Sequence, residues 1–305
     1  MTINRILCPI DFSETSAHAL EQAVAVAQWY KAHLTVLHVY PAVNRAYGAA
    51  ITDESAMQGP APTELLTARE HATKACAPAV AAGVAHEVVV TAGQPVHAIL
   101  HHVGALPADL LVMGTHGASG FQHLLLGSVT EKVLRRAACP VLTVPPRAQA
   151  STTRFGHVLC AVDFSDWSVK AAAAAASMAR ESGASLTLLH VLEWPWHEPP
   201  APPSVGVPPE QALALAEYRR YLETSARGRL EEVARTVAPD GEAPAIETRF
   251  GKPHVELMEE AREAGADLIV IGIRGRNAVD MGLFGSTTNQ VVRRATCPVL
   301  TIVSA

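Results

Sequence analysis

The sequence predicts an α/β protein made of two tandem, doubly wound, five-stranded parallel sheets. The first observation is a repeat, because Ile6–Ser13 returns as Val158–Ser165, and Asp109–Gly114 returns as Asp267–Gly272. The second is that apolar, β-branched runs alternate with helical patterns in each copy, as in parallel strands joined by right-handed crossovers. The third is that Leu110–Met113 is wholly apolar, as expected for a strand buried on both faces.

Five strands are expected in the first copy, and the second copy follows the same order. Each is a short apolar or β-branched run bounded by turn residues or by a helical pattern. In chain order they are Arg5–Ile10, Leu34–Tyr40, His86–Thr91, Leu110–Met113 and Val141–Val144.

Four helices are expected between these strands. Ser13 can cap the first, in which Leu20, Val24 and Ala27 share one face. The second is expected over Thr63–Val80. The third begins at Gly93-Gln94-Pro95, where proline suits the first turn, and the fourth spans Ser128–Ala137.

The repeat also predicts the domain boundaries. Early matches are offset by 152 positions (6 to 158) and later ones by 158 (109 to 267), so the extra residues lie between Val191 and Gly251. Trp194–Pro203 within that interval is rich in proline and is expected to be a surface loop. We expect nucleotide-binding domains at 1–146 and 154–305, with a linker near Pro145–Thr153.

The composition excludes several classes of partner. The chain of 305 residues has a formal net charge of -5, so it has no electrostatic attraction to nucleic acid or to an anionic membrane. It has no uncharged apolar run of the ~18 residues that a membrane span needs, and no apolar leader near Met1. The five cysteines show no metal-ligand spacing, and most lie at strands, as buried cysteines do. We therefore expect a cytoplasmic protein.

A glycine-rich segment follows the fourth strand of each copy with the same spacing. Gly114 and Gly117 are followed, after nine residues, by Gly127-Ser128; the second copy has Gly272, Gly275 and Gly285-Ser286. Loop glycines permit positive φ and the close approach of a ligand, and a helix N-terminus attracts anions. Ser128 and Glu131 are expected to form a capping box, and hydroxyls of Thr130, Thr287 and Thr288 are candidates to bond phosphate. The alternative is that the glycines only end a strand and begin a helix.

An aspartate ends the first strand of each copy, at Asp11 and Asp163. Ligands of open α/β sheets bind at the carboxyl ends of strands where the strand order reverses. If the first and fourth strands are neighbours, Asp11 and Gly114 line one crevice, where the carboxylate can accept hydrogen bonds from ribose. The alternative role is to cap the next helix, and both roles can hold together.

These motifs resemble the universal stress protein family, in its ATP-binding branch and tandem form. The resemblance is carried by Asp-Phe-Ser after the first strand, Leu-His-Val in the second, Gly-x-Pro, and the repeated Gly-2x-Gly-9x-Gly-Ser. It covers nearly the whole chain and implies a Rossmann-like sheet with strand order 3-2-1-4-5. It also implies one adenine nucleotide per copy, ATP alone or with Mg.

The resemblance assigns nucleotide contacts to matching positions in both copies. Asp11 and Asp163 would contact the nucleoside. The adenine would lie between backbone groups at the ends of the first and second strands, which are Pro9, Ile10 and Val39, or Ala161, Val162 and Val191. Ribose and phosphates would be held after the fourth strand by Met113, Gly114, Gly117, Gly127, Ser128, Val129 and Thr130, or by Ile271, Gly272, Gly275, Gly285, Ser286 and Thr287.

The two copies also differ from each other and from the family pattern. Ile10 and Val162 are larger than the residue that family members often have there, which would narrow the pocket. Asn289 stands where the first copy has Glu131, so the second copy lacks the expected capping box. The two sites are therefore expected to be tuned differently.

Other kinds of site receive less support. His97 and His101 are four residues apart on an expected helix, but no third metal ligand is evident, so a solvated or capping role is favoured over a metal site. The sequence contains no Gly-x-x-x-x-Gly-Lys-Ser/Thr loop, which argues against a P-loop NTPase. It has no Gly-x-Gly-x-x-Gly after the first strand, which argues against a dinucleotide-dependent oxidoreductase. Ser13 and Ser165 do not lie in a nucleophile elbow, so the sequence gives no support for hydrolase chemistry.

Three functional hypotheses follow. The favoured one is an ATP-binding regulatory protein of the stress response. The second is a slow ATPase or nucleotidyl-transfer enzyme. His116 and Arg274 lie within the first glycine pair of each loop, but they differ in kind, which argues against a common catalytic role. No catalytic residue is therefore assigned. The third is an interaction scaffold with vestigial sites. The last strands, Val141–Val144 and Val299–Val303, are candidates to pair between the domains or between two chains of a homodimer.

Overall fold

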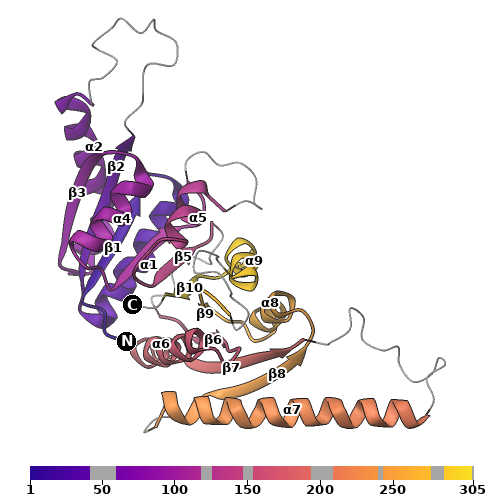
Figure 1. The fold of residues 1–305 in the computed structure, drawn as a ribbon. Coiled ribbons are helices and arrows are strands. Elements are labelled where there is room, and N and C mark those ends of the chain that lie inside the picture. Colours follow the sequence, from indigo (N-terminus) through magenta and orange to yellow (C-terminus); the bar gives the residue numbers. More distant parts are fainter. Residues whose placement is uncertain are drawn as a thin grey trace, which may run out of the picture. The chain divides into compact units, whose positions relative to one another are not determined.

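The computed structural model describes residues 1–41, 60–117, 126–146, 154–193, 209–239, 243–275 and 285–303. They form an α/β protein in which most strands are parallel, as predicted (Figure 1). By their contacts the residues divide into two compact units. The N-terminal unit comprises Thr2–Arg154 and Thr296–Ala305, and the C-terminal unit comprises Met1 and Phe155–Ala295.

The sheet of the N-terminal unit has the predicted strand order, β3-β2-β1-β4-β5, with all four pairings parallel. Its sixth strand, β10, comes from the end of the chain and pairs antiparallel with β5, placing Val299 opposite Thr143. The last strands of the two copies therefore pair with each other. The bounds are β1 (Arg5–Ile10), β2 (His33–Pro41), β3 (His86–Gly93), β4 (Leu110–Gly114), β5 (Val141–Val144) and β10 (Val299–Ile302).

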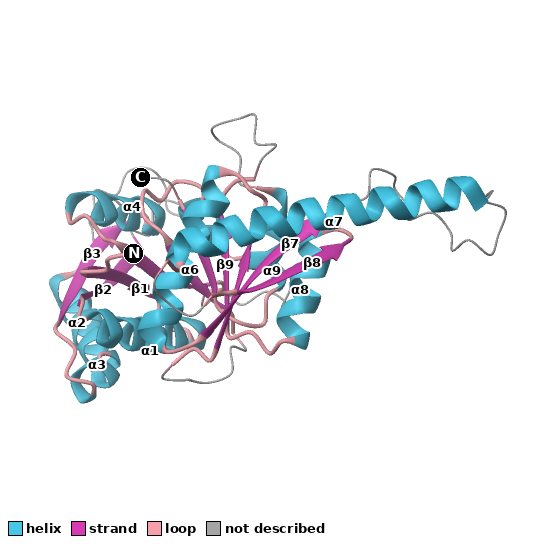
Figure 2. Cartoon of the chain, turned by 90° about the horizontal axis from the view of Figure 1, so that it is seen from below, coloured by secondary structure: helices cyan, strands magenta, loops and turns pink. Residues whose placement is uncertain are grey.

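Among the described residues of this unit, five helices cover both faces of the sheet. They are α1 (Glu14–Tyr30), α2 (Pro62–Ala75), α3 (Ala77–Ala81), α4 (Pro95–Ala105) and α5 (Ser128–Leu134). Figure 2 shows α1, α2 and α3 on one side of the strands and α4 on the other. Every residue of β4 and β5 is buried, which is why these strands lack alternating polar positions.

The C-terminal unit repeats this arrangement with four described parallel strands in the order β9-β6-β7-β8. Its strands are β6 (His157–Ala161), β7 (Ser185–Leu192), β8 (Ala245–Phe250) and β9 (Leu268–Gly272). Its helices are α6 (Asp166–Ser182), α7 (Pro209–Val237), α8 (Pro253–Glu263) and α9 (Ser286–Arg294). Helix α7 has 29 residues, against 14 in α2, and lies over β7 and β8 (Figure 2).

Two predicted helices differ in extent. The helix expected over Thr63–Val80 divides at Cys76, because Pro78 has no N–H to continue the hydrogen-bond ladder. The last helix of the first copy ends at Leu134, three residues early. The expected surface loop at Trp194–Pro203 and most of the linker lie outside the described residues.

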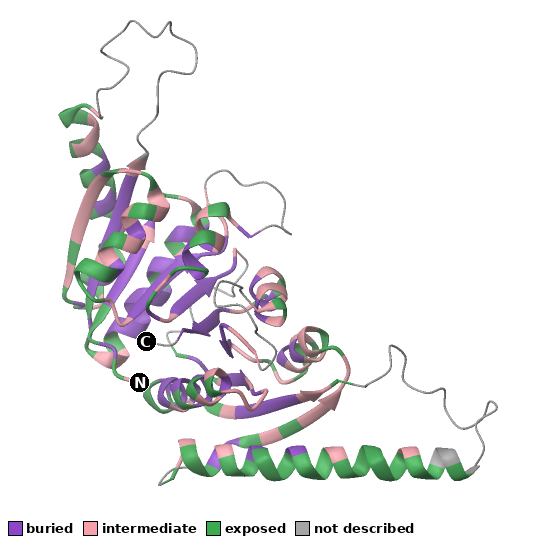
Figure 3. Ribbon diagram, in the orientation of Figure 1, coloured by how far each residue is buried: buried purple, intermediate pink, exposed green. Residues whose placement is uncertain are grey.

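Burial is highest in the inner strands, which are largely purple in Figure 3, whereas the edge strands β3 and β8 have no buried residue. The largest fully buried side chains include Ile6, Leu34 and Leu110 in one unit and Leu159 and Leu188 in the other. In the part of the chain that the structure describes, none of the helices has the length and apolarity required to cross a bilayer.

Candidate functional site

The Asp-Phe-Ser sequence forms the same tight turn after β1 and after β6. Asp163 Oδ1 accepts hydrogen bonds from the backbone N–H (3.0 Å) and the hydroxyl (2.5 Å) of Ser165, and this carboxylate closes the turn across Phe164. Phe164 is held at φ +64°, in the left-handed region that L residues rarely occupy. Phe12 has the same φ of +64° between Asp11 and Ser13.

The serine of this turn caps the following helix, as predicted. The Ser13 side chain accepts from the N–H of Ser16 at 3.2 Å, and Ser165 does the same for Ser168 at 3.3 Å. The aspartate therefore acts on the cap indirectly, by orienting the serine. Its second oxygen lies on the opposite side, toward the glycine-rich segment.

A phenylalanine–histidine pair, which was not predicted, lies beside each aspartate. The Phe164 ring lies 4.4 Å from the ring of His190, and Phe12 lies 4.3 Å from His38. Nδ1 of His190 donates to the carbonyl oxygen of Val162 at 2.7 Å, and His38 donates to Ile10 at 2.9 Å. The signal in the sequence was the same spacing of 26 positions in both copies (12 to 38, 164 to 190).

The glycines of the repeated segment are needed for close approach. A Cβ on Gly275 would lie 2.7 Å from Asp163 Oδ2, and one on Gly117 would lie 2.6 Å from Asp11 Oδ2. A Cβ on Gly114 would lie 2.7 Å from the Thr15 side chain. None of the six glycines has a positive φ, so the expected conformational role was wrong. The close contacts that the structure shows are to the protein's own atoms, and the expected close approach of a ligand stays a prediction.

The start of α9 is tied to the end of β9 by two hydrogen bonds. The N–H of Gly285 donates to Ile273 O at 3.0 Å, and the hydroxyl of Thr288 donates to Gly272 O at 2.8 Å. In the first copy Gly127 donates to Thr115 O and Thr130 to Gly114 O, each at 2.8 Å. Because their hydroxyl protons are used here, Thr130 and Thr288 fasten the loop and have no proton left for a phosphate.

The predicted capping box is absent. Gly127 is the N-cap of α5, so Ser128 is already the first helical residue and makes no side-chain cap. Glu131 instead accepts from Arg135, one turn later, at 2.9 Å. In the second copy Asn289 accepts from Arg293 at 2.7 Å, so the Glu131–Asn289 difference leaves the local structure the same.

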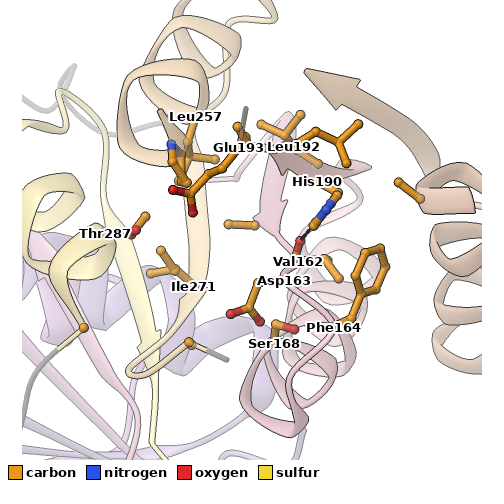
Figure 4. A pocket seen from close by; sticks show the side chains of 18 of the residues that line it. Val162, Asp163, Phe164, Ser168, His190, Leu192, Glu193, Leu257, Ile271 and Thr287 are labelled. Carbon is orange, nitrogen blue, oxygen red and sulfur yellow. Dashed lines mark hydrogen bonds between the residues drawn. The ribbon is translucent and has the colours of Figure 1, made fainter. Parts of the chain in front are cut away.

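One cavity of about 730 Å³ collects every predicted site residue of the second copy (Figure 4). They are Ala161, Val162, Asp163, Val191, Ile271, Gly272, Gly275, Gly285, Ser286 and Thr287. The cavity lies at the carboxyl ends of β6, β7 and β9 and at the start of α9. Figure 4 shows Thr287 and Ile271 on one side of Asp163, and His190 and Phe164 on the other.

Both signs of charge line this cavity. Its acids are Asp163 and Glu193 and its cations are Arg229 and Arg274. The Arg274 guanidinium lies 5.5 Å from the Trp167 ring, and Arg229 lies 3.9 Å from the Phe164 ring. The cavity therefore offers positive charge both near the glycine-rich segment and beneath α7.

The predicted residues of the first copy occupy equivalent positions in the N-terminal unit. Those at the ends of β1 and β2 are Pro9, Ile10, Asp11 and Val39, and those from β4 to α5 are Met113, Gly114, Gly117, Gly127, Ser128, Val129 and Thr130. The cavity described in this unit, of about 430 Å³, is lined by other residues, between Phe12 and α2. Within the described ranges, no group of three or more metal-binding side chains is arranged around a common point.

Comparisons with known proteins identify relatives over the whole chain. A model of the universal stress protein family matches residues 2–145 and 154–302. A universal stress protein of Mycolicibacterium smegmatis is 27% identical over 311 residues, covering 97% of this chain and 96% of its own length. Universal stress protein YxiE of Bacillus subtilis is 34% identical over 148 residues, covering 46% of this chain and 98% of its own length.

A solved structure that covers the whole chain has the same fold. A universal stress protein from Archaeoglobus fulgidus superposes with a TM-score of 0.72 at 24% identity, and both chains are covered to 100%. A universal stress protein in complex with cAMP is 26% identical, covers 48% of this chain and 99% of its own, and has a TM-score of 0.36.

Proposed function

The chain belongs to the universal stress protein family, and from that premise we propose that it binds adenine nucleotides, one per copy, as a regulatory protein of the stress response. The observation that carries the proposal is the single cavity that contains all ten predicted residues of the second copy. Its volume of about 730 Å³ falls within the range of small-molecule sites, roughly 300–1,000 Å³.

Each part of this cavity has a distinct chemical task in the proposal. The backbone at Val162 and Val191 flanks a planar base. Asp163, whose Oδ1 is held by Ser165, directs Oδ2 toward Gly275 and accepts from ribose hydroxyls there. The first amides of α9, at Ser286 and Thr287, face phosphate oxygens.

Close packing explains why glycine is required in this cradle. A side chain on Gly275 would displace the Asp163 carboxylate, and one on Gly285 would lie 3.0 Å from the Ile273 carbonyl. Arg274 adds a positive charge at the phosphate end. Where Mg²⁺ takes part, it enters with the triphosphate, because Mg²⁺ is usually bound through substrate phosphates and water.

The first copy has the same turn, the same glycine contacts and the same helix start. We propose a second nucleotide site there, with Asp11, Gly117 and Gly127 in the corresponding tasks. We further propose domain boundaries at 1–146 and 154–305 and a cytoplasmic location. We also propose that the protein is a homodimer, which a measurement of its mass in solution tests.

Calorimetric titration of the full chain with ATP tests the nucleotide sites. Gly275→Ala should abolish one site and Gly117→Ala the other, so that each variant binds one equivalent and the double variant none. Gly228→Ala and Gly104→Ala are matched controls, because a Cβ there meets no atom within 4 Å. cAMP is titrated in parallel to establish which nucleotide is preferred.

Two results would contradict the proposal. One is the absence of ATP binding by the unmodified chain at millimolar concentration. The other is an unchanged stoichiometry in the double variant, which would place the nucleotide elsewhere.

A further inference from the structure

The cavity of the C-terminal unit continues past the proposed nucleotide site toward α7. We call this extension the side pocket. It is lined by Phe164, His190, Leu192, Leu222, Ser225, Ala226 and Arg229. In Figure 4, Phe164, His190 and Leu192 lie on the far side of Asp163 from Thr287. None of these seven residues was among those predicted to touch the nucleotide.

The N-terminal unit has a pocket at the same place in its fold. Seven of the eight residues around its 430 Å³ cavity are repeat equivalents of the side pocket, at offsets of 152 (12 to 164) or 158 (71 to 229). They are Phe12, His38, Tyr40, Glu64, Thr67, Ala68 and His71. The same hollow therefore occurs twice, between the left-handed phenylalanine and the helix that follows the second strand.

The two pockets differ in chemistry. The side pocket has Leu192 and Leu222, where the N-terminal unit has Tyr40 and Glu64. The hydroxyl of Tyr40 donates to Glu64 Oε1 at 3.1 Å, and Glu64 Oε2 accepts from a backbone N–H at 2.8 Å. These two positions are therefore apolar in the side pocket, whereas in its counterpart they carry a hydroxyl and a fixed carboxylate.

A cation completes the side pocket. The Arg229 guanidinium lies 3.9 Å from the Phe164 ring, and among the described residues it forms no salt bridge. The acids that line the same cavity are Asp163, whose Oδ1 is held by Ser165, and Glu193, which is exposed. An arginine above an aromatic wall, with leucines around it, matches a flat apolar group that carries a negative charge.

We propose that the side pocket of the C-terminal unit binds a planar aromatic anion, and that the corresponding pocket of the N-terminal unit does not. Phe164 and the two leucines exclude water from the ring of the ligand, and Arg229 pairs with its carboxylate or phosphate. In the N-terminal unit, the Glu64 carboxylate repels the same ligand. The inference deepens the proposed function, since the ligand would lie beside the nucleotide in one cavity.

The test uses the full chain and 2-naphthoate, a fluorescent planar carboxylate, without nucleotide. We expect one equivalent to bind. Arg229→Gln should weaken binding about tenfold or more, since a hydrogen bond to a charged group is lost. Leu222→Glu, which introduces the residue of the other copy, should abolish binding. His71→Gln is the matched control and should leave the affinity unchanged.

A neutral probe separates charge from shape. 2-Naphthamide has the same ring system, and its affinity should be weaker and insensitive to Arg229→Gln. Thermal melting of each variant verifies folding, which we expect because Arg229 is exposed on α7. Equal 2-naphthoate affinity in the unmodified chain and both side-pocket variants would overturn the proposal, as would loss of binding in His71→Gln alone.

The same experiment keeps the two proposals distinct. Gly275→Ala should remove one equivalent of ATP but retain 2-naphthoate, because Gly275 belongs to the proposed nucleotide site and not to the side pocket. Binding of 2-naphthoate without any ATP binding would refute the nucleotide proposal alone. Binding of ATP without 2-naphthoate would refute the side pocket alone.

Discussion

Phe164 offers a direct test of the turn on which the site is built. An L residue in the left-handed region costs roughly 1–2 kcal/mol, and glycine avoids this cost. Replacement by alanine removes the ring but keeps the strain, whereas replacement by glycine removes both. We therefore expect Phe164→Gly to be more stable than Phe164→Ala by about 1 kcal/mol.

The loss of the Phe164 ring determines how far the free energy of unfolding falls in Phe164→Ala. The ring contacts His190, for which an aromatic pair contributes about 0.5–1.5 kcal/mol, and Arg229, for which an exposed cation–π contact contributes about 0.5–1 kcal/mol. Phe164→Ala should therefore lower the free energy of unfolding by about 1–2.5 kcal/mol. In Phe164→Gly, about 1 kcal/mol of this loss should be offset.

Urea denaturation of both variants, followed by circular dichroism, measures the difference. The same pair at Phe12 provides an internal repeat, because its φ is also +64°. Glu21, exposed within α1, provides the control, since glycine there should be less stable than alanine by about 1 kcal/mol. If alanine were as stable as glycine at both Phe12 and Phe164, the left-handed turn would be refuted.

Three further predictions concern stability. Burial raises the pKa of the Cys8 and Cys160 thiols, and raises that of Cys139 to about 12. The unfolded thiols ionise near pH 8.5, so the free energy of unfolding should fall as the pH rises above about 8.5. Urea midpoints between pH 7 and 10 measure this, and a flat profile would contradict it. Thr288→Val should cost about 1 kcal/mol by removing the donor to Gly272 O, and an unchanged melting temperature would show that this bond is unimportant. Arg249→Gln leaves three glutamates together, so its melting temperature should fall further at low salt than at high salt.

The regular part of the fold could be predicted from the sequence because burial imposes a period on it. The apolar run Leu110–Met113 identified β4, and the first and fifth strands were located with their observed bounds. The strand order followed from the family resemblance. The end of the second helix was missed, because the helical pattern continues through Cys76 while Pro78 interrupts the hydrogen bonds.

The local geometry of the site was less accessible. A glycine can be required for a positive φ or for close packing, and the second case depends on which residue lies opposite it. Asp163 lies opposite Gly275 but is 112 positions away in the sequence (163 to 275), so local spacing does not reveal the contact. The capping box failed because the N-cap lies one residue earlier, at Gly127, a shift that sequence spacing does not reveal. The side pocket needs α7 to lie across Phe164, a tertiary contact with no local pattern.

The difference between the two copies therefore lies elsewhere than the sequence indicated. Glu131 and Asn289 were expected to distinguish the sites, yet each accepts from an arginine one turn later. The two copies differ more at the positions that line a cavity. The C-terminal unit has leucines and Arg229 there, whereas the N-terminal unit has Tyr40 and Glu64. Since the glycine contacts are nearly the same in both copies, they give no means of choosing between ligands. Under the proposals above, selectivity between the two copies would come from the wall beneath the helix that follows the second strand, together with Arg274, which stands where the first copy has His116.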